Sequence, residues 1–284
     1  MLHQPIKYLK QLRSLQRINI ALTKAAATAP LRLIDPTNPV SWEFSGFSQH
    51  GEDGIIDYLT RQLKTSNRYF VEIGAANGLE NNSSWLALAR MYAGLMIDGD
   101  PEESAWCRYL VVPMNYGVEV NHMFLTRESV KEVAALSLHK NPDMFSLDID
   151  GNDYFIAEAL LQSAMRPKIW VVEYNSAFGP DRSVSIPYRE DFRLKQEYKL
   201  SLYCGCSITA WKKLMARHDY EFVTVDSNGV NAFFIDPNEF DPDFVRGLRG
   251  IGFRENLSHA REYKAHWPEQ FELIKDFEFV EIGV

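Results

Sequence analysis

The chain has 284 residues, of which 46% are hydrophobic and 24% are charged, and its net charge is −8 with a pI near 5.4. This length suits one large α/β domain with additions at both ends, and the composition excludes wholesale disorder. The acidic balance argues against a broad nucleic-acid surface, so we expect no nucleic-acid partner.

The cysteines and the apolar stretches indicate a cytoplasmic protein. Cys107, Cys204 and Cys206 provide no disulfide framework, and Cys204-Gly205-Cys206 lacks the two-residue gap of a zinc knuckle. No uncharged apolar stretch reaches the roughly 18 to 20 residues that cross a membrane. The N-terminus lacks a clean apolar core and a small-residue cleavage site, so we expect no signal peptide.

Residues 1–29 have the pattern of an amphipathic helix. Apolar residues recur at intervals of three from Ile6 to Ile18, and every charged residue before Asp35 is basic. One interpretation is peripheral contact with the inner face of a membrane or with a lipid-linked substrate. The other is a helix that caps the domain or pairs protomers in a homo-oligomer, and both stay open. Prolines then interrupt the pattern, which predicts an extended connector over residues 30–44.

The central stretch of the chain is residues 69–82, Tyr-Phe-Val-Glu-Ile-Gly-Ala-Ala-Asn-Gly-Leu-Glu-Asn-Asn. A helix is predicted over residues 55–63, before this stretch. The apolar run at the start of the stretch contains Glu72 and ends in a turn with Gly74 and Gly78. A second helix is predicted over residues 83–92. Glycines let a nucleotide-like ligand approach the backbone where a helix exposes unpaired N–H groups. The pattern therefore predicts a ligand site. One interpretation is that Gln49 borders this site, and the alternative is that Gln49 has a capping or surface role.

A second strand, residues 93–97, ends at Asp98, and Pro101 opens the next helix. An acid at the tip of the second strand of a βαβ unit can accept hydrogen bonds from both ribose hydroxyls, because the strand places it beside the first loop. Asp98 is the better candidate and Asp100 the next. The alternative is a turn acid or a helix cap.

Strands and helices continue to alternate after this point. Strands are predicted at residues 116–120, 144–148 and 168–172, with helices at 126–138 and up to Leu161. This alternation implies a parallel sheet with ligands at the carboxyl ends of its strands. Four acids would then share one rim: Glu72, Asp98, Asp148 and Glu173.

Residues 176–206 show no regular period and form the predicted substrate loop, which contains Arg182 and Tyr188. A helix follows over residues 208–217. Two strands, 220–225 and 230–235, then flank Asn228-Gly229, which is a strong hairpin signal. The sheet therefore closes with an antiparallel pair, and short helices are predicted beyond Pro237. The fold class is a three-layer, Rossmann-like α/β fold with a seven-stranded, mostly parallel sheet.

These pieces together resemble class I S-adenosylmethionine-dependent methyltransferases, most closely the FkbM-like O-methyltransferases. The stretches that carry the resemblance are Glu72-Ile-Gly-Ala-Ala-Asn-Gly78, Asp98, Asn228-Gly229, Ser48-Gln-His-Gly-Glu-Asp53, Ser146-Leu-Asp-Ile-Asp-Gly-Asn-Asp153 and Val172-Glu-Tyr-Asn175. The resemblance implies a methyltransferase domain over residues 46–236, preceded by a helix and connector (1–45) and followed by a helical extension (237–284). The closing hairpin and the spacing of the glycines differ from a dinucleotide-binding fold, whose loop reads G-x-G-x-x-G.

The resemblance also implies how S-adenosylmethionine is bound. The loop from Glu72 to Gly78 would cradle its methionine part and Asp98 its ribose. Asp148 would lie near the sulfonium, where a carboxylate favours the cationic cofactor over its neutral product. The predicted cofactor-binding residues are Gln49, Glu72, Gly74, Ala75, Asn77, Gly78, Ser83, Asp98 and Asp148.

The acceptor hydroxyl of such an enzyme needs a base or a metal ion, because a hydroxyl is a poor nucleophile at neutral pH. The predicted catalytic residues are Asp148, Asp150 and Glu173. By resemblance to magnesium-dependent O-methyltransferases, these acids and Asn175 would bind Mg²⁺ or another divalent cation. Tyr174, between Glu173 and Asn175, departs from that pattern. The alternatives are a turn or cap role for the segment containing Asp150 and direct binding of acceptor hydroxyls by Glu173.

The predicted function is O-methylation of a hydroxyl of a glycan, another polyol or a small molecule. The predicted substrate-binding residues are Glu173, Asn175, Arg182 and Tyr188. Two other hypotheses stay open: a non-catalytic cofactor-binding or assembly protein docked through its basic N-terminal helix, and an NAD-dependent sugar-nucleotide oxidoreductase.

Overall fold

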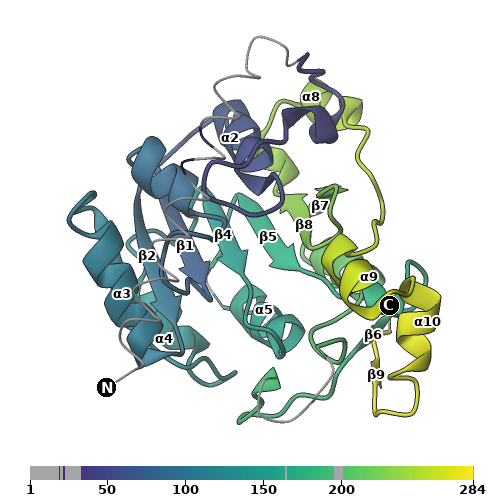
Figure 1. The fold of residues 1–284 in the computed structure, drawn as a ribbon. Coiled ribbons are helices and arrows are strands. Elements are labelled where there is room, and N and C mark those ends of the chain that lie inside the picture. Colours follow the sequence, from purple (N-terminus) through teal and green to yellow (C-terminus); the bar gives the residue numbers. More distant parts are fainter. Residues whose placement is uncertain (1–18, 20–21, 23–32, 164, 195–200, 284) are drawn as a thin grey trace.

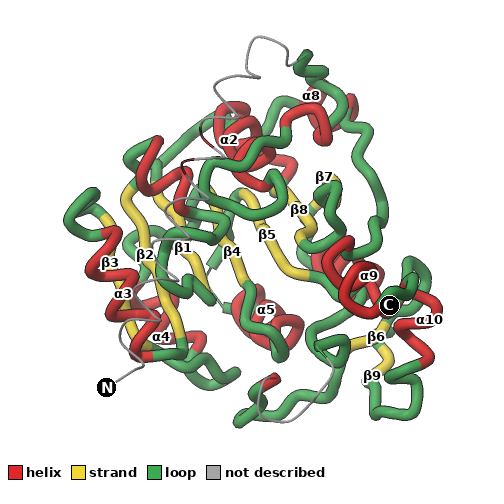
Figure 2. Tube along the Cα trace, in the orientation of Figure 1, coloured by secondary structure: helices red, strands yellow, loops and turns green. Residues whose placement is uncertain are grey.

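A seven-stranded sheet forms the centre of the molecule in the computed structural model, which describes residues 19, 22, 33–163, 165–194 and 201–283 (Figures 1 and 2). The strand order is β3-β2-β1-β4-β5-β8-β7. Five strands are parallel: β1 (Tyr69–Ile73), β2 (Ala93–Asp98), β3 (Val118–His122), β4 (Met144–Leu147) and β5 (Ile169–Glu173). Strand β8 (Asn231–Ile235) runs antiparallel to both β5 and β7 (Glu221–Val225). The predicted α/β fold class and its closing hairpin are confirmed.

Helices cover both faces of the sheet, and each face has its own core. Strand residues alternate between the two cores, so Val71 packs with α4 (Val130–Leu136), α5 (Asp153–Leu161) and α7 (Ile208–Arg217). Its neighbour Phe70 packs on the other face, with α2 (Glu52–Gln62) and α3 (Pro101–Val111). The face that carries α2 and α3 is called the α2 face below.

The segment after the first loop differs from the predicted helix over residues 83–92. The structure has only a five-residue π-helix, η3 (Trp85–Ala89). The Asn81 side chain accepts the backbone N–H groups of Ser83 and Ser84 at 3.2 and 3.0 Å, which holds these residues in a turn and delays the helix. The π-helix ends at Ala89, and Met91, two residues later, has a φ of 52° that is incompatible with a continuing helix. The polar residues of this segment therefore belong to a buried turn.

Two further elements are shorter or later than predicted. The helix predicted over residues 126–138 is α4, because Thr126 and Ser129 form a side-chain-to-backbone turn before it. Strand β3 begins two residues later than predicted, after a turn in which Asn115 accepts the Gly117 N–H at 2.9 Å.

The connector is not extended throughout. It contains a 3₁₀ helix, η2 (Pro39–Trp42), whose Trp42 is buried against Tyr58 with ring centroids 4.1 Å apart. The predicted helix over residues 1–29 lies outside the described residues apart from Asn19 and Leu22, so its proposed contacts stay predictions. No helix within the described ranges is long and apolar enough to cross a membrane.

The end of the chain folds back onto the predicted substrate loop. That loop contains η4 (Ser176–Phe178) and β6 (Val184–Ser185), and β6 pairs with an unpredicted strand, β9 (Val280–Glu281). The predicted short helices of the tail are η5 (Pro237–Glu239), α8 (Pro242–Gly247), α9 (Leu257–Tyr263) and α10 (Trp267–Glu272).

Candidate active site

Polar side chains interrupt the apolar pattern of the α2 face at the carboxyl ends of the central strands. Phe70, Met144 and Val171 belong to the core of that face. Because side chains alternate along a strand, the residues two positions further on, Glu72, Ser146 and Glu173, point the same way. Strands β1, β4 and β5 are neighbours, so these three side chains form one polar strip beneath the rim.

Glu72 is the buried end of this strip, with 1% of its surface exposed. Burial raises its pKa to about 8, and hydrogen bonding to Ser83 and Ser146 opposes part of that rise. Its Oε2 atom has no hydrogen-bond partner among the described residues. Glu72 and Ser83 thus lie under the first loop, and their predicted contact with a cofactor stays a prediction.

The two loop glycines are explained by contacts within the protein. At Gly74 the φ is +84°, and a Cβ would lie 1.6 Å from the backbone oxygen of Asp148. At Gly78 the φ is +76°, and a Cβ would lie 2.6 Å from the Cys107 sulfur. The first loop therefore passes directly against the end of β4 and against α3.

The other predicted cofactor residues of the loop have ordinary structural surroundings. Ala75 is buried, and the Asn77 side chain accepts the Leu79 N–H at 3.0 Å. Gln49 is exposed. Their roles toward a cofactor stay predictions.

Asp98 lies beside the first loop, as predicted. Its Oδ2 accepts the Ala76 N–H at 2.7 Å and its Oδ1 accepts the Asp100 N–H at 2.7 Å. A carboxylate offers about four acceptor positions, so about two are left for a diol. Asp100 has the alternative role of a helix cap, since it accepts the N–H groups of Glu102 and Glu103 at the start of α3.

Asp148, Asp150 and Glu173 form an acidic cluster. One carboxylate oxygen from each lies within 4.8 Å of the other two. Burial and the neighbouring carboxylates raise the pKa of both Asp148 and Glu173 well above the ordinary range. Three converging carboxylates fit a hard divalent cation, which prefers oxygen ligands. The predicted convergence of these three residues is confirmed.

The structure gives the fourth predicted cation ligand, Asn175, a different role. Its Nδ2 donates to the backbone oxygens of Leu202 and Cys204 at 2.6 and 3.0 Å, and its Oδ1 accepts the Ala177 N–H at 3.0 Å. The amide therefore ties the predicted substrate loop to the end of β5, and we do not include Asn175 among the candidate cation ligands.

Arg182 and Tyr188, the predicted substrate residues of the loop, are engaged in packing. The Arg182 guanidinium lies 3.7 Å from the Phe271 ring centroid and donates to the Phe178 backbone oxygen at 3.2 Å. The Tyr188 hydroxyl accepts the Arg127 N–H at 3.1 Å. Contact of either with a substrate stays a prediction.

Asn231 is a polar residue of the rim that the sequence pattern did not single out. It opens β8, pairs with Glu173 across the sheet and is 4% exposed. The turn at Asn228-Gly229 located its strand, but the register between β5 and β8 that brings it to Glu173 is a long-range feature without a local signal.

No protein-family model matches the chain, and no curated protein matches it. Similar solved structures include a magnesium protoporphyrin IX methyltransferase from Synechocystis with bound SAM (10% identity, TM-score 0.41), covering 65% of this chain and 77% of that chain. An O-methyltransferase from Bacillus cereus in complex with SAH has 16% identity and a TM-score of 0.41, covering 78% and 89%. The O-methyltransferase TomG from Streptomyces achromogenes, in complex with SAM, has 18% identity and a TM-score of 0.43, covering 75% and 87%. At these values we assign neither activity nor site residues from the similarity.

Proposed function

We propose that the protein is an S-adenosylmethionine-dependent O-methyltransferase that methylates a hydroxyl of a glycan or another polyol. The observation that carries this proposal is the placement of Asp98 and the acidic cluster on either side of the first loop. Asp98 contacts that loop at Ala76, and Asp148 contacts it at Gly74. Asp98, the proposed ribose-binding acid, and Asp148, a proposed proton acceptor, therefore lie on either side of that loop.

The charge of the rim suits a cationic cofactor. S-adenosylmethionine carries a sulfonium and an ammonium group, whereas its demethylated product has lost the sulfonium charge. Asp148 and Glu173 form no ion pair with a lysine, arginine or histidine of the described residues. Carboxylates without a protein counter-charge favour binding of the methylated, cationic form.

The transfer itself needs positioning and one proton acceptor. The acceptor oxygen attacks the methyl carbon in line with the carbon–sulfur bond, which breaks with its electron pair on sulfur. The hydroxyl proton passes to the ionised form of Asp148 or Glu173, whose raised pKa values make each a stronger proton acceptor than an ordinary carboxylate. A divalent cation, when bound by Asp148, Asp150 and Glu173, would lower the pKa of the acceptor hydroxyl.

The test combines binding with turnover. Calorimetry should show binding of S-adenosylmethionine and none of NAD. Incubation with methyl-labelled cofactor and a panel of methyl glycosides should yield base-stable methyl ethers. Glu173→Gln should lower kcat by about 100-fold or more, because general-base catalysis contributes that much. Glu221→Gln, at an exposed position of β7 at the other end of the sheet, is the matched control and should retain activity.

Three other results would favour a different function or overturn the proposal. Absence of cofactor binding overturns the proposal, and binding of NAD in its place favours an oxidoreductase. Tight binding of S-adenosylmethionine with no product from any glycoside favours a non-catalytic cofactor-binding protein.

A further inference from the structure

We propose that Asn231, oriented by Glu52, supplies the fourth oxygen of a divalent-cation site with Asp148, Asp150 and Glu173. This inference deepens the proposed function and rests on it for its role, because the cation would lie where the acceptor hydroxyl reacts. The amide ligand is then Asn231 of β8, the strand next to β5, and Asn175 has no part in the site.

The strand register puts Asn231 next to the acidic cluster. Asn231 and Glu173 are directly paired between the antiparallel strands β8 and β5. Side chains of paired residues share a face, and their Cβ atoms lie roughly 4.5 to 5.5 Å apart. Phe233, two positions along β8, belongs to the core of the α2 face, which places Asn231 on the face of Glu173.

The orientation of the Asn231 amide is fixed by Glu52. Its Nδ2 donates to Glu52 Oε1 at 2.8 Å, and Glu52 Oε2 accepts the His50 N–H at 2.7 Å. Because a carboxylate only accepts, the nitrogen of the amide faces Glu52. The Oδ1 atom is therefore turned away from Glu52, and we place it toward Glu173, the residue directly paired with Asn231 on the same face.

The Oδ1 atom of Asn231 has no hydrogen-bond partner among the described residues, although the residue is only 4% exposed. A buried acceptor without a donor or a cation destabilises the folded state. Amide oxygens are ordinary ligands of Ca²⁺ and related hard cations, alongside carboxylates. A cation at the cluster would satisfy this oxygen and neutralise Asp148 and Glu173 at once, which a hydroxyl donor alone would not do.

The first experiment titrates the metal-free full-length chain with Mn²⁺ and measures free Mn²⁺ by electron paramagnetic resonance. We expect one site, which Asp148→Asn and Glu173→Gln both abolish. Asn231→Leu should weaken Mn²⁺ binding by about 10-fold or more. The matched control is Asn121→Leu, since Asn121 is also a strand asparagine whose Nδ2 donates to a glutamate, Glu119, at 2.9 Å. The control should bind Mn²⁺ like the wild type.

Two more variants separate ligation from folding. Asn231→Asp combined with Glu52→Gln keeps an oxygen ligand at position 231, adds charge there and replaces the facing carboxylate by an amide that can donate, so this double variant should bind Mn²⁺ at least as tightly as the wild type. Glu52→Leu releases the amide and should weaken binding by about 10-fold without touching the metal. If Asn231→Leu does not fold, the double variant Asn231→Asp with Glu52→Gln decides: loss of Mn²⁺ binding there overturns the proposal. Wild-type affinity in a folded Asn231→Leu, or no Mn²⁺ binding by the wild type at millimolar concentration, overturns it too.

The outcome can be separated from that of the proposed function. Methyl transfer that continues in EDTA, with no Mn²⁺ bound by the wild type, leaves the transferase and removes the cation site. Mn²⁺ binding that depends on Asn231, with no binding of S-adenosylmethionine, leaves the cation site and removes the transferase.

Discussion

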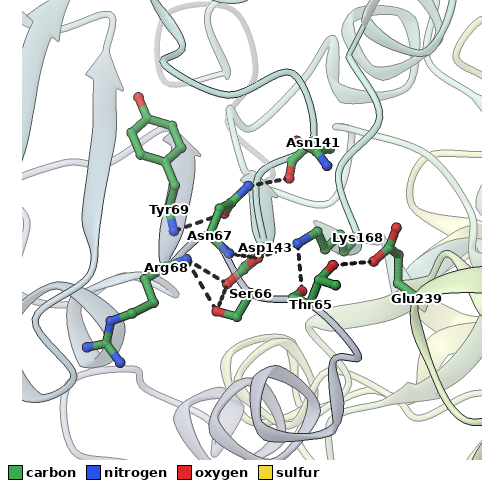
Figure 3. A network of polar contacts seen from close by, with 9 residues as sticks. All are labelled: Thr65, Ser66, Asn67, Arg68, Tyr69, Asn141, Asp143, Lys168 and Glu239. Carbon is green, nitrogen blue, oxygen red and sulfur yellow. Dashed lines mark hydrogen bonds and ion pairs between the residues drawn. The ribbon is translucent and has the colours of Figure 1, made fainter.

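A buried ion pair at the amino ends of β4 and β5 gives the clearest stability prediction. Lys168 and Asp143 are 2% and 0% exposed, and the Nζ–Oδ1 distance is 2.9 Å (Figure 3). Asp143 also accepts the Ser66 hydroxyl and the N–H groups of Asn67 and Arg68, while Lys168 Nζ donates to the Thr65 backbone oxygen at 2.7 Å. The pair thus joins the turn before β1 to β4 and β5.

Replacing one partner should leave a buried charge without its counter-charge. Removing one member of a buried ion pair costs about 3 to 5 kcal/mol of unfolding free energy. For Lys168→Met we expect the lower end, because three donors from the Ser66–Arg68 turn still solvate Asp143. Asp143→Asn leaves the Lys168 ammonium with neutral oxygens only and no counter-charge. The double variant should cost about 2 kcal/mol less than the sum of the two single changes.

Urea denaturation of the wild type, the two single variants and the double variant measures the four unfolding free energies, provided that the slope m, the dependence of the unfolding free energy on urea, is the same in all four. The affinity for S-adenosylmethionine should stay unchanged, since the pair lies at the end of the sheet opposite the acidic cluster. Additive single changes, or a loss below about 1 kcal/mol for Lys168→Met, would refute the reasoning that the interaction is desolvated.

Three further changes test the site. Asp98→Ala should weaken S-adenosylmethionine binding by about 10- to 100-fold by calorimetry, through loss of charged hydrogen bonds to the ribose, and unaltered affinity would show the ribose assignment to be wrong. Gly74→Ala should lower the unfolding free energy by about 3 kcal/mol or more, because its Cβ would lie 1.6 Å from the Asp148 oxygen; a stability like that of the wild type would contradict the observed loop path. Burial raises the pKa of Glu72 from 4.5 to about 8, so the folded protein holds a proton that the unfolded chain releases, and stability should fall as pH rises through this window. Glu72→Gln should flatten that slope by up to about 1.4 kcal/mol per pH unit, and an equal slope in both proteins would count against the assignment.

Most of the fold could be predicted because its signals are local. Apolar runs of strand length marked the parallel strands, Pro101 marked the start of α3, and Asn228-Gly229 marked the hairpin. The predicted helix over residues 83–92 was wrong in extent because the Asn81 side chain competes for the backbone N–H groups that would begin it. Strand β9 was missed because two residues carry no periodicity.

The site was predictable where strand ends alone determine it. Acids at the ends of neighbouring parallel strands must meet at one edge, so Asp148 and Glu173 were found together. The role of Asn175 depends on Leu202 and Cys204, which only the folded loop brings to it. The position of Asn231 depends on strand register in the same way.

The rim is built of acceptors, and this restricts what can occupy it. Glu72 and Asn231 each have a buried oxygen without a partner among the described residues. Protons can relieve the carboxylates, as the raised pKa of Glu72 indicates, but a proton cannot relieve an amide oxygen at neutral pH. Only a bound group with positive charge or hydrogen-bond donors satisfies both kinds of oxygen. A sulfonium cofactor beside the first loop and a divalent cation beside Asn231 would divide that task along the rim, which is why cofactor and metal binding should be measured separately.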